Sequence, residues 1–270
     1  MPHGAPPFGG SAGASPGMKA AIGGSGGGTG SYSQLQPETG FSGGPTNAKM
    51  YTYVPKTFKK GNPVVVGLHH CAGTGPGYFK EYPDWPKNAE HKGFMMIFAS
   101  SPGEKGDCWD VSSQASLKHD GGGDTQSIAE MIKYAVTKYG CSDHQVYIVG
   151  HSSGAMLTQA LGATYPDIFL AGAAYSGVPA GCFSTGQAKG AGWNTKCAHG
   201  MLIETPQAWG QKAKDMYPVS QKTAFEDGSS ITYGESQSLT SECARPTCLS
   251  TSSGLQSFLS SHDACARNTG

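Results

Sequence analysis

The segment Val146-Tyr-Ile-Val-Gly-His-Ser-Ser-Gly-Ala-Met-Leu-Thr-Gln-Ala-Leu161 decides the fold. It starts with an apolar, β-prone run, turns through Gly150-His-Ser-Ser-Gly154, and continues with helix-forming residues toward Tyr165. The turn has the pattern G-x-S-x-G of a nucleophile elbow. A serine in such a sharp turn needs flanking glycines, because side chains there would collide with neighbouring backbone. We therefore expect a strand, an exposed Ser152 and a helix, in that order.

Further strands and helices are expected on both sides of this segment. Unbroken apolar runs predict strands that are buried on both faces of a parallel sheet, and apolar residues at helical spacing predict a helix. Alternating strands and helices predict an α/β fold, specifically an α/β-hydrolase-like doubly wound parallel sheet. The expected strands cover residues 50–54, 63–68, 94–99 and 169–175, and the expected helix covers residues 124–139.

Composition divides the chain into three parts. Residues 1–47 are rich in Gly, Pro and Ser, and we expect a disordered N-terminal segment. Residues 48–218 are expected to form the catalytic domain. Residues 219–270 are rich in Ser and Thr and have no apolar strand, so we expect an atypical, poorly ordered tail and a sheet that is incomplete at its C-terminal end.

The charge balance excludes several classes of partner. The 19 basic and 19 acidic residues cancel, and a nucleic-acid partner would require a basic excess. No apolar run reaches the length of a membrane span. We therefore expect no nucleic-acid or membrane partner, and a monomer.

The eight cysteines indicate where the protein works. They are dispersed and form no paired C-x-x-C arrangement, so we expect disulfides, an extracellular location, no metal and no cofactor. Residues 1–30 contain no apolar run typical of a signal peptide.

Two backbone amides are candidates for stabilising an oxyanion. One belongs to Ser153, directly after the nucleophile, and the other to Cys71, in the loop after the strand at residues 63–68. Alternatively, Cys71 is only a disulfide partner. The two roles are compatible, because an oxyanion hole uses only the backbone.

Six motifs follow one another along the chain: YTYVP at 51–55, HHCAGTG at 69–75, CWDVSSQ at 108–114, HDGGG at 119–123, the elbow itself and YSGVPAGC at 175–182. Together they resemble the fungal secreted esterases of carbohydrate esterase family 1, over about residues 47–218. That family contains acetylxylan and feruloyl esterases and is related to polyhydroxybutyrate depolymerases. The resemblance implies that Ser152 is the nucleophile.

The resemblance also implies roles for an aromatic residue and four cysteines. Trp109 matches a family tryptophan near the active-site loops and is a candidate for substrate binding. Alternatively, Trp109 is a buried aromatic that packs the core. The implied disulfides are Cys71–Cys108 and Cys182–Cys197, whereas Cys141, Cys243, Cys248 and Cys265 have no assigned partner.

The resemblance stops at Tyr217-Pro218, before the family's triad Asp and His. The elbow also carries His151 where the family commonly has a small residue. Asp227 followed by His262 satisfies the chain order Ser, Asp, His of this fold. However, no apolar strand precedes Asp227, so we expect a chain that lacks the C-terminal part of the family.

Three functions follow from these observations. The first is a serine carboxylic ester hydrolase that removes acetyl or feruloyl groups from plant cell-wall xylan, with an esterified polysaccharide as its partner. The second is a catalytically impaired, truncated esterase or a carbohydrate-binding remnant. The third is a polyhydroxyalkanoate depolymerase.

Overall fold

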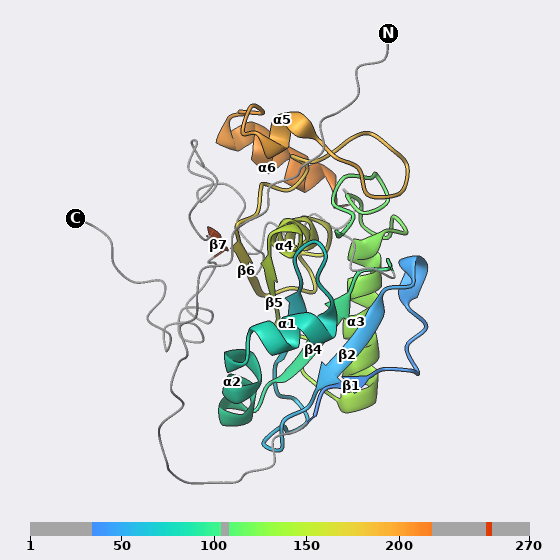
Figure 1. Cartoon of the computed structure of the whole chain (residues 1–270), viewed down its shortest axis with the longest axis vertical. Coiled ribbons are helices and arrows are strands. Elements are labelled where there is room, and N and C mark those ends of the chain that lie inside the picture. Colours follow the sequence, from blue (N-terminus) through green and yellow to red (C-terminus); the bar gives the residue numbers. More distant parts are fainter. Residues whose placement is uncertain (1–33, 104–107, 218–246, 250–270) are drawn as a thin grey trace, which may run out of the picture. The chain divides into compact units, whose positions relative to one another are not determined.

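The computed structural model describes residues 34–103, 108–217 and 247–249. The strands of this part of the chain form one sheet in the order β1-β2-β4-β3-β5-β6-β7 (Figure 1). They are β1 (Gln36–Pro37), β2 (Lys49–Tyr53), β3 (Val64–Leu68), β4 (Met95–Ser100), β5 (Val146–His151), β6 (Ala171–Tyr175) and β7 (Thr247–Leu249).

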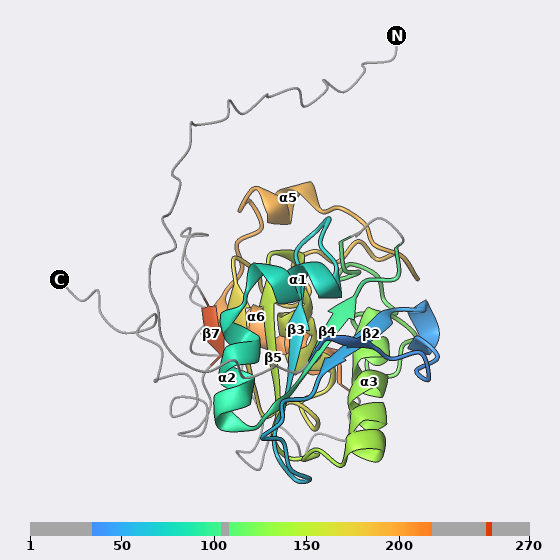
Figure 2. The ribbon, with the colours of Figure 1, turned by 60° about the horizontal axis from the view of Figure 1, so that its bottom comes forward.

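Helices cover both faces of this sheet (Figure 2). The first two α-helices pack on one face, and α3 and α4 pack on the other. The helical elements are η1 (Gly44–Thr46), α1 (Gly75–Glu81), α2 (Asp84–Lys92), α3 (Asp124–Tyr139), α4 (Ser153–Thr164), α5 (Thr195–Ala198) and α6 (Pro206–Asp215).

The sheet is mixed, whereas the sequence predicted a parallel one. Strands β3, β4, β5 and β6 are parallel neighbours, as expected. However, β2 pairs antiparallel with β4, β1 pairs antiparallel with β2, and β7 pairs antiparallel with β6. An apolar run signals burial on both faces but not strand direction, so the antiparallel outer strands could not be foreseen.

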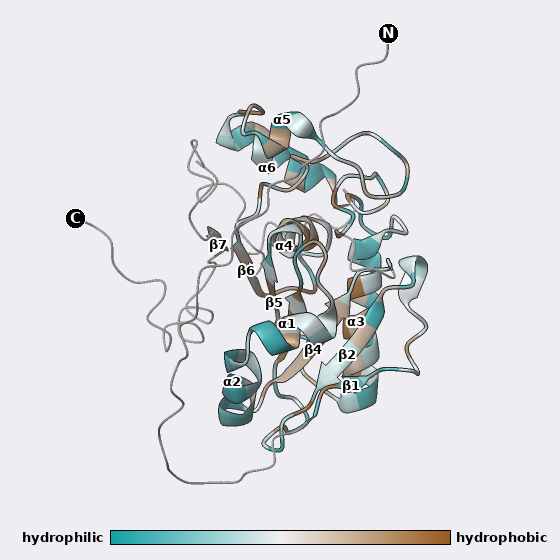
Figure 3. Ribbon diagram, viewed as in Figure 1, coloured by the Kyte–Doolittle hydropathy of each residue, from teal (hydrophilic) through white to brown (hydrophobic). Residues whose placement is uncertain are grey.

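The two cores follow the alternation of side chains along each strand. Val64, Val66 and Leu68 of β3 pack with α3 and α4, whereas Val65 packs with α1 and α2. All five residues of β3 and all six of β4 are buried. Figure 3 shows the hydrophobic residues concentrated in these strands, while α2 is largely hydrophilic. The prediction of strands buried on both faces is confirmed.

The expected disorder of residues 1–47 is wrong for residues 34–47. Within this range β1 pairs with β2, and Glu38 is buried. The Glu38 carboxylate accepts hydrogen bonds from Thr52 Oγ1 (2.6 Å), the Tyr134 and Tyr139 hydroxyls and Lys138 Nζ. The ordered fold therefore begins before residue 48.

The C-terminal boundary also needs one correction. Thr247–Leu249 lies within the predicted tail at residues 219–270, yet it adds an edge strand beside β6. The rest of that tail lies outside the described residues.

Candidate active site

The predicted elbow is present between β5 and α4. Ser152 has φ 55° and ψ −117°, a conformation that costs a non-glycine residue about 1–3 kcal/mol and persists only where the surroundings enforce it. Its amide donates to the carbonyl of Tyr175 at the end of β6 (2.9 Å). Ser152 therefore stands at the carboxyl edge of the parallel strands.

Both elbow glycines are required by close backbone contacts. A Cβ on Gly150 would lie 2.1 Å from the carbonyl oxygen of Gly154, and a Cβ on Gly154 would lie 2.2 Å from that of Leu68. The second contact brings the N-terminus of α4 against the end of β3. The close packing at Gly154 thus holds the turn of Ser152 against the end of β3, where the loop of Cys71 begins.

The two candidate oxyanion amides lie at this junction. Within the described part of the chain, neither the Cys71 amide nor the Ser153 amide donates a hydrogen bond to another protein group. Ser153 is the first residue of α4, where the backbone N–H groups have no partner in the helix and the helix dipole favours negative charge. Ala72, next to Cys71, has φ 62° and is also strained.

Trp109 lies beneath this loop and is not available to a substrate. Its side chain is 1% exposed, and Nε1 donates to the carbonyl of His69 (2.9 Å). The substrate-binding role that the resemblance implied is therefore wrong, and the alternative of a core aromatic holds. An indole N–H that finds a buried carbonyl partner is typical of packing.

His69 is a neutral, structural histidine. Nε2 accepts from the Ser101 amide (3.0 Å), so the ring proton is on Nδ1, which donates to the His70 carbonyl (2.6 Å). Burial lowers the pKa of His69. Because both ring nitrogens are used, His69 cannot serve Ser152 as a base.

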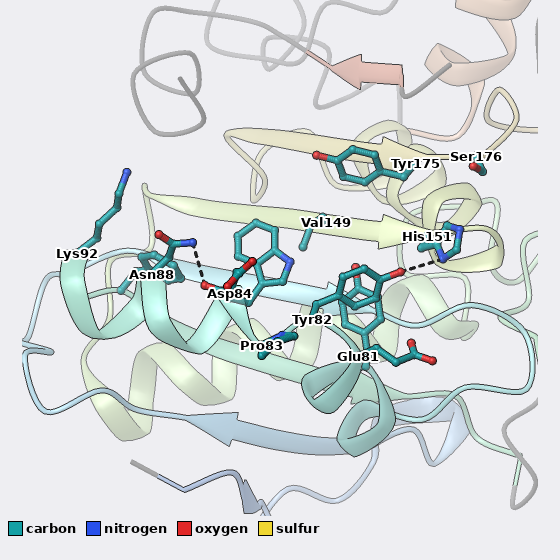
Figure 4. A pocket seen from close by; sticks show the side chains of 13 residues that line it. Glu81, Tyr82, Pro83, Asp84, Asn88, Lys92, Val149, His151, Tyr175 and Ser176 are labelled. Atoms are coloured by element: carbon teal, nitrogen blue, oxygen red, sulfur yellow. Dashed lines mark hydrogen bonds between the residues drawn. The ribbon is translucent and has the colours of Figure 1, made fainter. Parts of the chain in front are cut away.

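Four polar side chains surround the elbow on the side of α1. His70 Nε2 lies 3.2 Å from both carboxylate oxygens of Glu81, and the Tyr82 hydroxyl lies 3.2 Å from His151 Nδ1. The His70 and His151 rings meet edge to face with centroids 5.8 Å apart. Figure 4 shows the Tyr82 hydroxyl, just after α1, pointing toward His151, with the hydrogen bond between them dashed.

A cavity of about 540 Å³ adjoins these side chains. Its lining combines five Tyr, Trp and Phe side chains with charged and polar ones (Figure 4). It is lined by Tyr78, Glu81, Tyr82, Pro83, Asp84, Trp85, Asn88, Lys92, Phe94, Val149, His151, Tyr175 and Ser176.

No described side chain acts as a base for Ser152. Among residues 34–103 and 108–217, no imidazole or carboxylate hydrogen-bonds to the Ser152 hydroxyl. The candidates Asp227 and His262 lie outside the described residues. In the same described part, no group of three or more His, Cys, Asp or Glu side chains could hold a metal ion, and no helix could cross a membrane.

Both disulfides implied by the resemblance are present. Cys71 and Cys108 have Cα atoms 4.1 Å apart, and Cys182 and Cys197 have Cα atoms 5.7 Å apart. The first bridge anchors the oxyanion loop directly. Cys141 is a buried free thiol, and burial raises its pKa to about 11. Cys243 and Cys265 lie outside the described residues, and Cys248 lies in β7.

The sequence reasoning missed one exposed aromatic residue near the site. Trp193 is 67% exposed in the loop closed by Cys182–Cys197, and its ring packs edge to face on Phe183 (5.2 Å). Phe183 in turn shares a small cavity with Met156, one turn into α4. A large aromatic in a glycine-rich, disulfide-closed loop was the available signal.

Fold and site together define an α/β-hydrolase-like protein with a serine at its nucleophile elbow. Residues 49–190 match the family described as Esterase PHB depolymerase, and the chain belongs to this family.

Similar proteins agree with this assignment. The chain is 48% identical over 184 residues to the probable acetylxylan esterase A of Aspergillus clavatus, covering 68% of this chain and 59% of that protein. It is 47% identical to acetylxylan esterase A of Aspergillus ficuum, of which it covers 60%. The structure of the acetyl xylan esterase from Aspergillus awamori is 46% identical, with a TM-score of 0.66, over 69% of this chain and 67% of that one. The chain therefore spans about three-fifths of the length of the curated relatives that it matches.

Proposed function

We propose that this protein is a serine carboxylic ester hydrolase that removes acetyl groups from xylan. The observation that carries the proposal is Ser152, held at φ 55° between a buried strand and a helix N-terminus. The relatives named acetylxylan esterase support the acetyl group and the xylan backbone as substrate. The two disulfides support an extracellular site of action.

In this proposal the Ser152 oxygen attacks the ester carbonyl carbon. The carbonyl oxygen becomes negative and accepts hydrogen bonds from the Cys71 and Ser153 amides. Donors aimed at a developing oxyanion are worth about 10²–10³-fold each in rate. The sugar alkoxide then leaves with a proton, and water hydrolyses the acyl-serine ester by the reverse sequence.

The proton must pass through a base, since a serine hydroxyl is a weak nucleophile by itself. His262, oriented by Asp227, is the pair with the chain order of this fold. The described side chains around Ser152 are engaged elsewhere, and no apolar strand precedes Asp227, so we expect acetate release at a low rate that does not depend on this pair.

The test is release of acetate from acetylated xylan, compared with methyl ferulate and polyhydroxybutyrate. We expect acetate release, and we expect Ser152→Ala to abolish it. An active Ser152→Ala variant would remove the nucleophile from the proposal. Preferential cleavage of methyl ferulate or polyhydroxybutyrate would replace the substrate while leaving the mechanism intact.

A further inference from the structure

His70 makes two polar contacts that together require a fully protonated ring. Nδ1 lies 2.6 Å from the Cys71 carbonyl oxygen, and Nε2 lies 3.2 Å from each oxygen of the Glu81 carboxylate. Both partners are acceptors, so both ring nitrogens must donate. The Cys71 carbonyl and the Glu81 carboxylate accordingly raise the pKa of His70.

These contacts connect the end of α1 to the oxyanion loop. Glu81 is the last residue of α1, and Cys71 precedes Ala72, whose φ of 62° makes the loop strained. The Cys71–Cys108 bridge fixes the side chain of Cys71, but a disulfide leaves the adjoining peptide planes free to rotate. The hydrogen bond from His70 to the Cys71 carbonyl restrains that rotation.

We propose that His70, held by Glu81, is a positioning residue that fixes the Cys71 backbone as an oxyanion donor for Ser152. This inference rests on the proposed ester hydrolase function. His70 itself need not touch the substrate. It acts by keeping the loop in its strained conformation before the substrate arrives. Donors that are already in place need no reorganisation during the reaction, and this is the source of their effect.

Groups from each neighbouring element face the His70 ring. Glu81 and Tyr82 come from the end of α1, His151 comes from β5, and the buried, neutral His69 adjoins it in the chain. Only Glu81 among these carries a negative charge that pairs with His70. The His70 and Glu81 side chains are 30% and 50% exposed, so solvent weakens the pair without abolishing it.

The sign of the pH dependence follows from the raised pKa. Protonated His70 ties the Cys71 carbonyl to Glu81 at low pH. As the pH rises through the pKa of His70 in the folded protein, Nε2 loses its proton and its bond to Glu81, so the ring no longer anchors Cys71 to α1 even where Nδ1 keeps its proton. Ester turnover should therefore fall on an alkaline limb. Replacing Glu81 by Gln removes one of the two groups that raise the pKa of His70 and should shift this limb to lower pH.

The experiment measures kcat and KM for 4-nitrophenyl acetate against pH in the full chain. His70→Ala should lower kcat about 10- to 100-fold with KM changed less than twofold, since the interaction acts only in the transition state. Glu81→Gln should lower kcat less and move the alkaline limb. His144→Gln is the matched control, because the His144 side chain is 91% exposed and precedes β5, whereas the elbow follows the other end of that strand. An unchanged kcat in His70→Ala, with the protein folded by circular dichroism, would overturn the proposal.

A second readout separates this inference from the proposed function. In Ser152→Ala, the amide resonances of Cys71 and Ala72 should titrate with the same midpoint as the His70 ring, and Glu81→Gln should lower that midpoint. If the amide resonances of Cys71 and Ala72 do not change as His70 titrates, the positioning link is refuted, whatever the turnover. If the two amides titrate with His70 but the unmutated chain hydrolyses no ester, the ester hydrolase proposal is refuted and the positioning link stands.

Discussion

Gly154→Ala should disturb the elbow more than the addition of one methyl group suggests. The new Cβ would lie 2.2 Å from the Leu68 carbonyl oxygen and 2.7 Å from that of His69. Non-bonded contacts of carbon need more than 3 Å, so α4 and the end of β3 must separate by about 1 Å. Both contacts are with backbone, and the His69 carbonyl also holds Trp109, so no flexible side chain can yield.

Two effects follow from this separation. Overpacking costs about 1–3 kcal/mol of unfolding free energy, and the better helix propensity of Ala recovers less than about 1 kcal/mol. The shift also moves Ser152 relative to the Cys71 amide, and a 1 Å misplacement can cost about 10²-fold in rate. We therefore expect a modest loss of stability and a large loss of turnover.

Urea unfolding followed by circular dichroism and hydrolysis of 4-nitrophenyl acetate would measure the two effects. Gly77→Ala is the matched control, because Gly77 lies in the first turn of α1 and its new Cβ would meet only Thr74 Oγ1, at 3.1 Å. If Gly154→Ala keeps wild-type turnover, the close contact between α4 and β3 does not set the active-site geometry, and the reasoning fails.

Three further predictions concern regions around the site. Glu38→Gln should lower the free energy of urea unfolding by about 1–3 kcal/mol. Burial raises the pKa of Glu38, but hydrogen bonds from Lys138 and Thr52 bring it below its usual value. The stabilisation is therefore present at neutral pH and is lost as the pH falls through the pKa of Glu38 in the folded protein, and an equal effect of the variant at pH 3 would contradict this assignment. Replacing both Cys182 and Cys197 by Ser should lower the unfolding free energy by about 3 kcal/mol, because the bridge closes a loop of 15 residues; an unchanged midpoint would speak against the bridge. Because no apolar strand precedes Asp227, we expect a low ester turnover that His262→Gln leaves unchanged, and its loss in that variant would show that His262 is the base.

Local patterns predicted the centre of this fold well. The strands at β3 and β4 were evident because every residue in them except Ser100 is apolar, as expected of strands buried on both faces. The elbow was evident because only glycine fits at positions 150 and 154. In each of these cases the deciding interaction lies within a few residues or follows from burial alone.

Interactions between distant residues account for the errors. Glu38 lies in a glycine- and proline-rich stretch, and its partners Tyr134 and Lys138 are about 100 residues away. Trp109 appeared near the site by resemblance, yet its burial depends on the carbonyl of His69, 40 residues earlier. Composition and motif carry no information about such pairs, so neither the ordered start of the fold nor the role of Trp109 could be derived.

Strained backbone conformations gather at the ends of the parallel strands, around the proposed nucleophile and oxyanion donors. Ala72, Ser152 and Ser176 have φ of 62°, 55° and 60°, and each follows the carboxyl end of a parallel strand, β3, β5 or β6. Strained residues persist where the surroundings over-determine them, and here the surroundings are a disulfide, a glycine contact and a histidine–carboxylate pair. A donor that is already in place needs no reorganisation during reaction. In the proposed mechanism the nucleophile and the oxyanion donors are therefore preorganised independently of the base, so the rate without a base would measure their contribution directly.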